Sequence, residues 1–565
     1  MSKHRHLAMS LCIMTVVAAV LAAGSTALGQ GPGWAGGGGG AGGATPTTEL
    51  TTFETQNFAG SGICAACHSG LRDANGNDVS MDTHWRSTMM ANASKDPLWQ
   101  AKIESEVNRN LALSQVIEDK CSKCHMPMAR TQAVANDMVV GVLGTGFLSP
   151  DNALHAAARD AISCSLCHQI QAEGLGEPSS FTGGYVIDTS SRAPDRLTFG
   201  KFQNVGLNPM RISSGFTPVY GAQTMVSGMC GSCHTLYTPM IDAAGNVVGE
   251  FPEQMTYPEW EHSDYGRSMD PGLSCQGCHM PLASGAAKLS NRPVRLPARS
   301  PFHQHHLVGG NTFVVGLLGQ YLGDLGVTAT VAHLDATEAR IVNQLTTRTG
   351  GVSVASSGLA NDTLTVDLLV ENRTGHKLPS GIPLRQVWIH LTVTDGTGQV
   401  LFESGAPLAD GRIEGNDADT AGAFEPHYDL ITSADQVQIY EPVMADTDGA
   451  LTWTFLRAAS YLKDNRLLPL GFDKATAPAD IAVWGAAAND ANFLGGSDLV
   501  RYAVDVAGAE LPLTVSAELL YQAVSHPFLA DLRLDQGELV QRFVGYYDQA
   551  DKSPVLISSV EIVVQ

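Results

Sequence analysis

The chain has 565 residues, which is long enough for two or more domains, and its 44% hydrophobic content allows a packed core. It carries 56 acidic against 34 basic side chains, a net charge of −22, so nucleic acid and anionic lipid are disfavoured as partners. A basic partner, or one that docks through a local patch, fits better.

Residues 1–29 are typical of a secretory signal peptide. Lys3 and Arg5 form the charged start, and residues 11–23 form the apolar run. A membrane anchor is the alternative, but a spanning helix needs about 20 apolar residues. Residues 30–52 follow as a glycine-rich flexible linker. We therefore expect an exported protein, in the periplasm or at the outer cell surface, with no transmembrane segment in the mature chain.

Five copies of the pattern Cys-x-x-Cys-His occur between residues 53 and 310. In this pattern the two thiols can add to the vinyl groups of a porphyrin, and the histidine becomes the proximal iron ligand. A zinc site or a thiol redox pair is the alternative, but neither requires a histidine after every pair. Ten of the eleven cysteines lie in these copies. We therefore predict five covalently attached haem c groups, bound by Cys64, Cys67 and His68, by Cys121, Cys124 and His125, by Cys164, Cys167 and His168, by Cys230, Cys233 and His234, and by Cys275, Cys278 and His279.

Helices are predicted to lead into several of these motifs. Residues 96–110 begin with an Asp-Pro start signal and run towards the second motif, and residues 152–162 lead into the third. Residues 174–221 are rich in glycine and proline and predict a long irregular loop with short strands, which haem groups that replace much of the polypeptide core would permit. Residues 311–347 predict further helix. Residues 53–347 are therefore predicted to form a pentahaem domain of helices and loops.

The pattern changes in residues 350–565, where cysteine is absent and apolar residues alternate between turns. The segment Asp395-Gly396-Thr397-Gly398 is a hairpin signal, and a helical piece is expected near residues 527–548. This half is predicted to be a mostly β, immunoglobulin-like sandwich, which makes the fold class mixed. The predicted strands are residues 364–370, 387–393, 400–402, 437–443, 513–520 and 555–564.

The sixth ligand of each haem iron separates a carrier from an enzyme, because a second histidine closes the iron and an open position permits catalysis. His84 follows the first motif, and His155 lies on the helix predicted before the third. His306 ends a histidine cluster after the fifth motif, and His376 lies in a tight loop of the second half. We predict these four histidines as further iron ligands, with a structural role as the open alternative for each. Structural roles are favoured for His390, His427 and His526, and Met90 is a weaker alternative ligand.

These motifs resemble those of the cytochrome c-554 group of bacterial multihaem cytochromes. Two of the five copies continue as His-Met-Pro, and Thr-Gly-His-Lys-Leu-Pro-Ser-Gly stands at residues 374–381. Residues 461–469 also resemble a stretch of large exported cytochromes. The resemblance covers most of the mature chain and implies closely spaced haem groups that form an electron wire. Pentahaem nitrite reductases share this haem-rich organisation, but one of their motifs usually ends in lysine. All five copies here end in histidine, so that catalytic marker is absent.

The sequence therefore predicts a pentahaem c-type cytochrome that transfers electrons between redox partner proteins in the periplasm or at the cell surface. The third motif is predicted to be a middle relay of the path. The alternative is a multihaem oxidoreductase that acts on a small nitrogen or sulfur compound at one open haem. The sequence names no pocket for such a compound, so an electron carrier is favoured over an enzyme.

Overall fold

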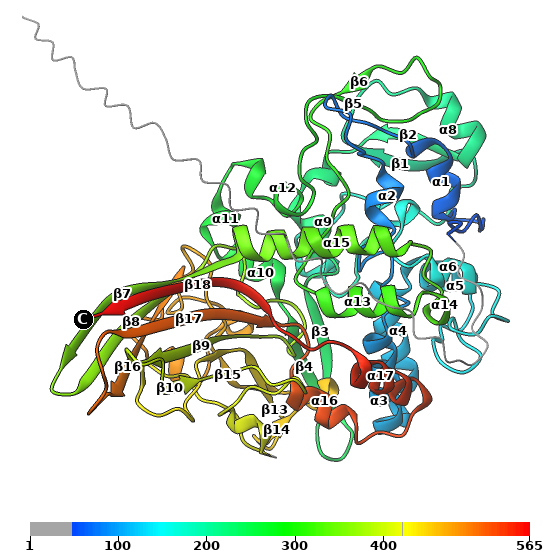
Figure 1. The fold of residues 1–565 in the computed structure, drawn as a ribbon. Coiled ribbons are helices and arrows are strands. Elements are labelled where there is room, and N and C mark those ends of the chain that lie inside the picture. Colours follow the sequence, from blue (N-terminus) through cyan, green and yellow to red (C-terminus); the bar gives the residue numbers. More distant parts are fainter. Residues whose placement is uncertain (1–47, 421) are drawn as a thin grey trace, which may run out of the picture. The chain divides into compact units, whose positions relative to one another are not determined.

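The computed structural model describes residues 48–420 and 422–565, which belong to one compact unit (Figure 1). The predicted signal peptide and most of the predicted linker lie outside the described residues. The described residues contain both helices and sheets, which confirms the mixed fold class. Within them, no helix combines the length and the apolar character that crossing a membrane requires.

Each Cys-x-x-Cys-His motif lies on or beside a short helix. Residues three apart share one face of a helix, so the two sulfurs point to the same side in the four motifs whose cysteines both lie in the helix. Three of these helices end on the motif histidine, and in the other two the histidine follows the last helical residue by one or three positions. The five helices are α1 (Ser61–His68), α4 (Ser114–His125), α7 (Cys164–Cys167), α9 (Ser227–Gly231) and α12 (Cys275–His279).

Helix α3 (Pro97–Arg109) confirms the predicted start, because the Asp96 carboxylate caps it by accepting the backbone N–H of Leu98 at 2.9 Å. Helix α6 (His155–Arg159) is shorter than the predicted segment. The remaining elements of this region are α2 (Met81–Trp85), α5 (Pro127–Ala135), α10 (Thr256–Glu261), α11 (Asp264–Arg267), β3 (Leu236–Ile241), β4 (Val247–Gln254), β5 (Ala287–Lys288) and β6 (Ala298–Arg299).

The segment predicted as a long loop contains more structure than its composition suggests. Strand β1 (Arg196–Gly200) pairs in parallel with β2 (Phe216–Tyr220), and helix α8 (Leu207–Ser214) connects them. The short strands were predicted, whereas α8 was not. Pro209 hides this helix in the sequence, although proline is tolerated in the first turn because the N–H groups there have no partner within the helix.

Helices α13 (Thr312–Gln320), α14 (Leu322–Leu325) and α15 (Val331–Gln344) confirm the predicted helical segment and lead into the β half. One sheet has the order β10-β9-β17-β18 with β12 also paired to β9, and a second has the order β11-β16-β8-β7. A third sheet has the order β14-β13-β15. Their bounds are β7 (Gly350–Ala360), β8 (Thr363–Asn372), β9 (Gln386–Thr394), β10 (Val400–Ser404), β11 (Leu430–Ile431), β12 (Ile439–Tyr440), β13 (Pro442–Ala445), β14 (Leu451–Thr452), β15 (Ser460–Asp464), β16 (Ser497–Asp505), β17 (Leu513–Gln522) and β18 (Val555–Val564).

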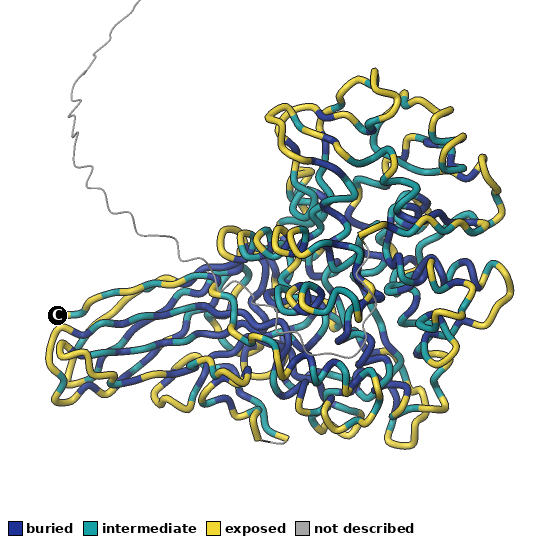
Figure 2. The backbone as a smooth tube through the Cα atoms, turned by 45° about the vertical axis from the view of Figure 1, so that its right-hand side comes forward, coloured by how far each residue is buried: buried dark blue, intermediate teal, exposed yellow. Residues whose placement is uncertain are grey.

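The two larger sheets share one apolar core. Alternate residues of β8, β9, β16 and β17 are buried in it, as the period of two in a strand requires (Figure 2). This pairing of sheets agrees with the predicted sandwich, and the immunoglobulin-like description stays a prediction.

The C-terminal helices α16 (His526–Leu532) and α17 (Glu538–Gln549) pack back onto the haem-motif half (Figure 1). The carboxylate of Glu104 on α3 accepts the backbone N–H groups of Leu539 and Val540 at 2.7 and 3.0 Å. A negative charge at a helix N-terminus is stabilising. Arg109 of α3 also pairs with Asp531 and Asp535 at 2.9 Å each. These contacts join the two halves of the chain.

Candidate haem-binding site

One cavity of about 1410 Å³ is lined by all fifteen residues of the five motifs. The motifs are spread over more than two hundred residues of sequence, and yet the structure brings every motif cysteine and histidine to this space. None of the ten cysteines in the described residues forms a disulfide, so all ten thiols are free to react. The cavity therefore has the attachment groups that covalent haem needs.

Four of the five motif histidines are held with Nε2 free. Nδ1 of His68, His125, His168 and His279 lies 2.6–3.1 Å from a backbone carbonyl oxygen. A carbonyl only accepts, so Nδ1 carries the proton and Nε2 keeps its lone pair. A metal-bound histidine almost always donates its other N–H in this way, which fixes the ring orientation. In His234, Nδ1 lies 3.4 Å from Nε2 of Gln254, so this amide must be reversed for its oxygen to accept Nδ1–H and for Nε2 to keep its lone pair.

Burial lowers the pKa of His68, His125, His234 and His279, which favours the neutral form that binds a metal. Burial lowers the pKa of His125 to about 4, against a smaller upward effect of its bond to Ala93. Burial, with the charges of neighbouring groups such as His279, lowers the pKa of His234 to about 4. The residues present thus fit covalent haem with a proximal imidazole at each motif.

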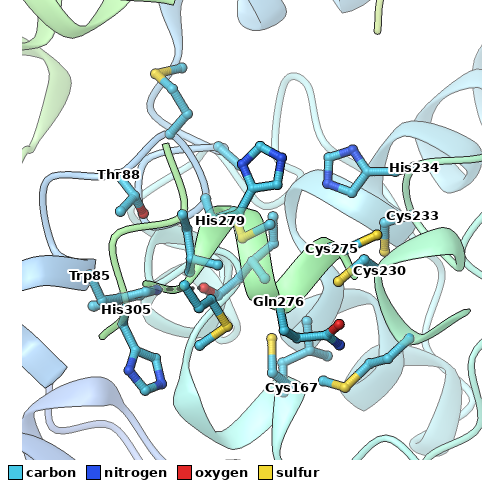
Figure 3. Close-up of a pocket in the computed structure, with 18 of the residues that line it drawn as sticks. Trp85, Thr88, Cys167, Cys230, Cys233, His234, Cys275, Gln276, His279 and His305 are labelled. Carbon is cyan, nitrogen blue, oxygen red and sulfur yellow. Dashed lines mark hydrogen bonds between the residues drawn. The ribbon is translucent and has the colours of Figure 1, made fainter. Parts of the chain in front are cut away.

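The motif sulfurs form a connected network. Cys64 lies next to Cys164, and Cys230 lies next to Cys275. Cys233 of the fourth motif lies next to Cys124 of the second. Figure 3 shows Cys230, Cys233 and Cys275 together, and Cys167 of the third motif lies further off. Burial raises the pKa of Cys167, and Cys233 is near enough for its charge to add to that rise. Neighbouring sulfurs therefore join motif 1 to motif 3 and motif 4 to motifs 2 and 5, and the charge effect relates motif 3 to motif 4.

The four predicted sixth ligands are distributed unevenly. Only His376 is part of the cavity lining among the described residues, and its charge affects both His234 and His279. His84 and His306 lie edge to face with ring centroids 4.6 Å apart, outside that lining. Nδ1 of the half-buried His155 donates to the Phe147 carbonyl at 3.0 Å. Iron ligation by these four residues stays a prediction.

Two cavity histidines were not predicted as ligands. His303 and His305 both line the cavity, and the ring of His305 lies 6.5 Å from that of His168. His303 forms a β-bridge with Leu282, so the chain is extended there. Side chains alternate sides in an extended segment, so His303 and His305 share one side and His306 takes the other. Which histidines of the cluster face the cavity is therefore decided by the extended backbone, which the sequence does not reveal.

His376 is held by a network that links the two halves. The Glu259 carboxylate on α10 accepts the backbone N–H of Lys377 at 3.1 Å and the hydroxyl of Ser380 at 2.9 Å. Nδ1 of His376 donates to the carbonyl of Lys377 at 3.0 Å, which leaves Nε2 free. The loop of the β half therefore presents an imidazole to the cavity in the orientation of a metal ligand.

Replacing His376 by alanine in the haem-loaded protein is expected to open the sixth position of one haem iron. The electron-spin resonance spectrum of the oxidised protein should gain a high-spin signal from that iron, while the others keep their spin state. His390→Ala is the matched control, because His390 lies on β9 and bonds the exposed carboxylates of Glu403 and Glu518. An unchanged spectrum in the His376 variant would refute this ligand.

Charged side chains line the cavity beside Cys121. Nζ of Lys102 lies 2.9 Å from Oε1 of Glu106, and both side chains are buried. Glu253 also lines the cavity but forms no ion pair within the described part of the chain. Burial and the nearby charge of Glu106 raise the pKa of Glu253 from 4.5 to about 8. Glu253 is therefore a buried carboxyl group that is mostly protonated at neutral pH.

This raised pKa predicts a specific pH dependence of stability. Between about pH 4.5 and 8 the folded protein holds a proton on Glu253 that the unfolded chain releases, so stability falls as the pH rises through this window. Glu253→Gln mimics the protonated group and removes the loss. In urea unfolding, the free energy of unfolding of the variant should increase relative to that of the wild type as the pH rises from about 5.5 to about 8. Glu250→Gln, an exposed site on the same strand, should show no such gain, and a pH-independent difference for Glu253→Gln would contradict the assignment.

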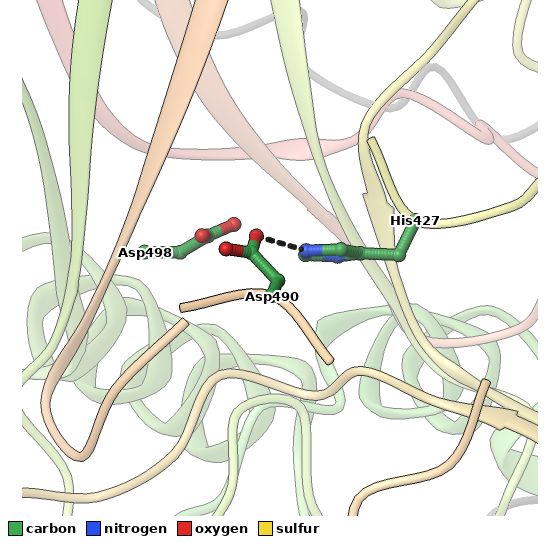
Figure 4. Close-up of side chains that lie close together, drawn as sticks. All are labelled: His427, Asp490 and Asp498. Atoms are coloured by element: carbon green, nitrogen blue, oxygen red, sulfur yellow. Dashed lines mark hydrogen bonds and ion pairs between the residues drawn. The ribbon is translucent and has the colours of Figure 1, made fainter. Parts of the chain in front are cut away.

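A second group of ligand-type side chains lies in the β half. Single donor atoms of His427, Asp490 and Asp498 lie within 4.8 Å of one another (Figure 4). Nε2 of His427 lies 3.0 Å from Oδ2 of Asp490. Oδ2 of Asp498 accepts the hydroxyl of Tyr440 at 2.7 Å, and its Oδ1 is buried without a protein partner. Such a set could hold a metal only if the imidazole offered a free lone pair.

The hydrogen bonds around His427 exclude that condition. Its Nδ1 accepts hydrogen bonds from the side-chain nitrogens of Gln438 and Asn465, at 2.8 and 3.1 Å. The oxygen of each amide already accepts a backbone N–H, so neither amide can be reversed. Nε2 must then carry the proton and donate it to Asp490, and a protonated nitrogen is not a metal ligand. The group ties the loops of the β half together, which agrees with the structural role predicted for His427.

Neither a protein-family model nor a curated protein sequence matches this chain. Among solved structures, the chain is similar to one described as a penta-heme cytochrome c552 from Thermochromatium tepidum. The two are 16% identical with a TM-score of 0.48, and the match covers 92% of this chain and 100% of that one. The assignment of haem to the cavity therefore rests on the residues of this chain.

Proposed function

We propose that this protein is an exported pentahaem c-type cytochrome that transfers electrons between redox partners in the periplasm or at the cell surface. One observation carries the proposal: all fifteen motif residues, from five separate segments, line a single cavity. Haem c bound there supplies reversible one-electron chemistry at iron. The chain contributes the thiols, the neutral imidazoles and a mostly buried enclosure.

The sulfur network suggests the route of the electrons. Motif 1 is linked only to motif 3 and motif 3 to motif 4, where the path divides towards motifs 2 and 5. A carrier with three ends can accept electrons at one and deliver them at another. The third motif keeps the relay role that its sequence position suggests, but the fourth motif is the branch point.

An oxidoreductase that acts on a small nitrogen or sulfur compound is the second candidate. The observation in its favour is the group of Lys102, Glu106 and Glu253, which could exchange protons with a compound beside motif 2. Glu106 and Glu253 lie close enough to Cys121 of motif 2 for their charges to act on its thiol. The second haem is therefore where an open iron should be sought.

Spin state separates the two candidates. In the oxidised haem-loaded protein, a carrier predicts low-spin iron throughout, and its spectrum should not change when nitrite or hydroxylamine is added. A high-spin component that shifts with either compound would instead establish the oxidoreductase and contradict the pure carrier.

A further inference from the structure

Two segments of this acidic chain contain no acidic residue at all. Residues 196–220 and 287–299, together named the basic lobe here, have none, although the whole chain carries a net charge of −22. A surface of opposite sign to the rest of the molecule produces a local field that the net charge does not describe. The basic residues of the lobe are Arg196, Lys201, Arg211, Lys288, Arg292, Arg295 and Arg299.

The two segments pack together in space. The first contains β1, α8 and β2, the second contains β5 and β6, and Figure 1 shows them side by side. Nη2 of Arg299 donates to the carbonyl of Asn204 at 3.1 Å, which ties one segment to the other. The lobe is therefore one surface region built from two distant parts of the sequence.

Most cations of the lobe are not neutralised. Arg211 pairs with Asp195, which lies just outside the lobe. Among the described residues, the other exposed or half-exposed cations form no ion pair, and Lys288 donates only to a backbone carbonyl. Apolar side chains stand between them, with Ile212 84% and Val294 73% exposed. Exposed apolar groups among unpaired charges of one sign are typical of an interaction site.

The lobe also covers the first haem motif. The carbonyl of Leu289 accepts Nδ1–H of His68 at 2.7 Å. The backbone N–H of Asn291 donates to the Cys67 carbonyl at 2.8 Å. Helix α8 contacts α1, and both segments contribute to the cavity lining. A molecule seated on the lobe would therefore lie on the same segments that hold His68 and Cys67 of motif 1.

We propose that the basic lobe is the docking surface for an acidic electron-transfer protein, which exchanges electrons through the haem at motif 1. The inference rests on the proposed function and adds the chemical class of one partner. An anionic membrane is the weaker occupant, because the remaining surface of a chain with net charge −22 would be repelled by it. Motif 1 is also an end of the sulfur network, which is where a partner must gain access.

Haem carboxylates could use some of these cations, so the test uses those outside the cavity. Lys201, Arg292 and Arg299 line the cavity, whereas Lys288 and Arg295 are exposed and do not belong to its lining. The test variant is Lys288→Gln with Arg295→Gln. The control is Arg412→Gln with Arg533→Gln, which removes the same charge from exposed ion pairs of the β half.

The experiment is stopped-flow oxidation of the reduced haem-loaded protein by hexacyanoferrate(III), a trivalent anion, at increasing ionic strength. If the lobe controls access, the rate constant falls about tenfold as salt rises from about 0.01 to about 0.5 M, despite the net negative charge. In the lobe variant the rate constant should be lower at low salt and should depend only weakly on salt. The control should behave as the wild type. Poly-glutamate should slow the wild type and leave the lobe variant unaffected.

Four results would overturn the proposal. A wild-type rate that rises with salt would mean that the net charge governs access. If the lobe variant and the control lost the same part of the salt dependence, the lobe would have no special role in access. Self-association at low salt that needs Lys288 and Arg295 would assign the lobe to a second copy of the chain, and sedimentation with phosphatidylglycerol vesicles that needs them would assign it to a membrane. Failure of the proposed function is recognised separately, by protein that cannot be reduced and re-oxidised reversibly.

Discussion

Asp464→Ala is expected to lower the free energy of unfolding by about 3–5 kcal/mol, because it leaves buried cations without their partner. Nζ of Lys377 lies 2.6 Å from Oδ2 of Asp464, and the side chains are 0% and 2% exposed. Arg466 lies 2.8 Å from the same carboxylate and 2.9 Å from Glu259. Burial alone would raise the pKa of Asp464, but the charges of Arg466 and Lys377 outweigh it and lower the pKa to about 2.

Denaturant unfolding of the haem-loaded protein measures this loss. Asp410→Ala is the control, because Asp410 forms an exposed pair with Arg412 at 2.9 Å, and such pairs contribute at most about 1 kcal/mol. The Asp464 variant should also disturb the haem that His376 is predicted to ligate, since the Lys377 backbone holds that loop. Equal stability of the two variants would show that the buried network does not secure the junction between the halves.

Removal of the fourth haem, by Cys230→Ala with Cys233→Ala, is expected to divide the electron path. This motif has sulfurs next to those of motifs 2 and 5 and lies within reach of the charge of Cys167 of motif 3, so we expect its loss to separate motif 2, motif 5 and the pair of motifs 1 and 3. Voltammetry of an adsorbed protein film should then show only part of the remaining haem exchanging electrons at high scan rate. The rest should respond slowly, because electron tunnelling weakens steeply with distance.

The control removes an end of the same network, by Cys275→Ala with Cys278→Ala. Four connected haem groups remain in that variant, and all should respond together. The branched order would be contradicted if all remaining haem responded at high scan rate after loss of the fourth haem. It would also be contradicted if only part of the remaining haem responded after loss of the fifth.

The residues proposed to attach haem could be recognised in the sequence because the chemistry proposed for them is local. Two thiols and a histidine must stand within five residues to bind one haem, so the pattern survives in the sequence without any knowledge of the fold. The order of the motifs in space was not predictable in this way. Cys233 meets Cys124 and Cys167 only after long intervening segments have folded, and nothing in the spacing of the motifs records those contacts.

The histidines predicted as further iron ligands show the same division. The histidine cluster was found from the sequence, but which of its members faces the cavity depends on an extended backbone that places His303 and His305 on one side. His376 was selected because a glycine and a proline fix its loop, and the structure places it in the cavity. Its support by Glu259 from the other half could not be predicted, since 116 residues of chain lie between Glu259 and His376.

Several strands of the β half were predicted from their alternation, but β7 and β16 were missed, although β16 also alternates. Strands β8, β9 and β17 alternate apolar and polar residues and were found near their observed bounds. Strand β7 is rich in glycine and serine and was missed, because it is held by its ladder with β8 more than by its own side chains.

The intact mass of the denatured, mature protein, produced with a haem-attachment system, tests the central claim most directly. Covalent haem survives denaturation, so the account predicts the mass of the processed chain plus five haem groups. A mass that includes fewer haem groups, or none, would contradict the proposal that all five motifs lining the cavity bind haem.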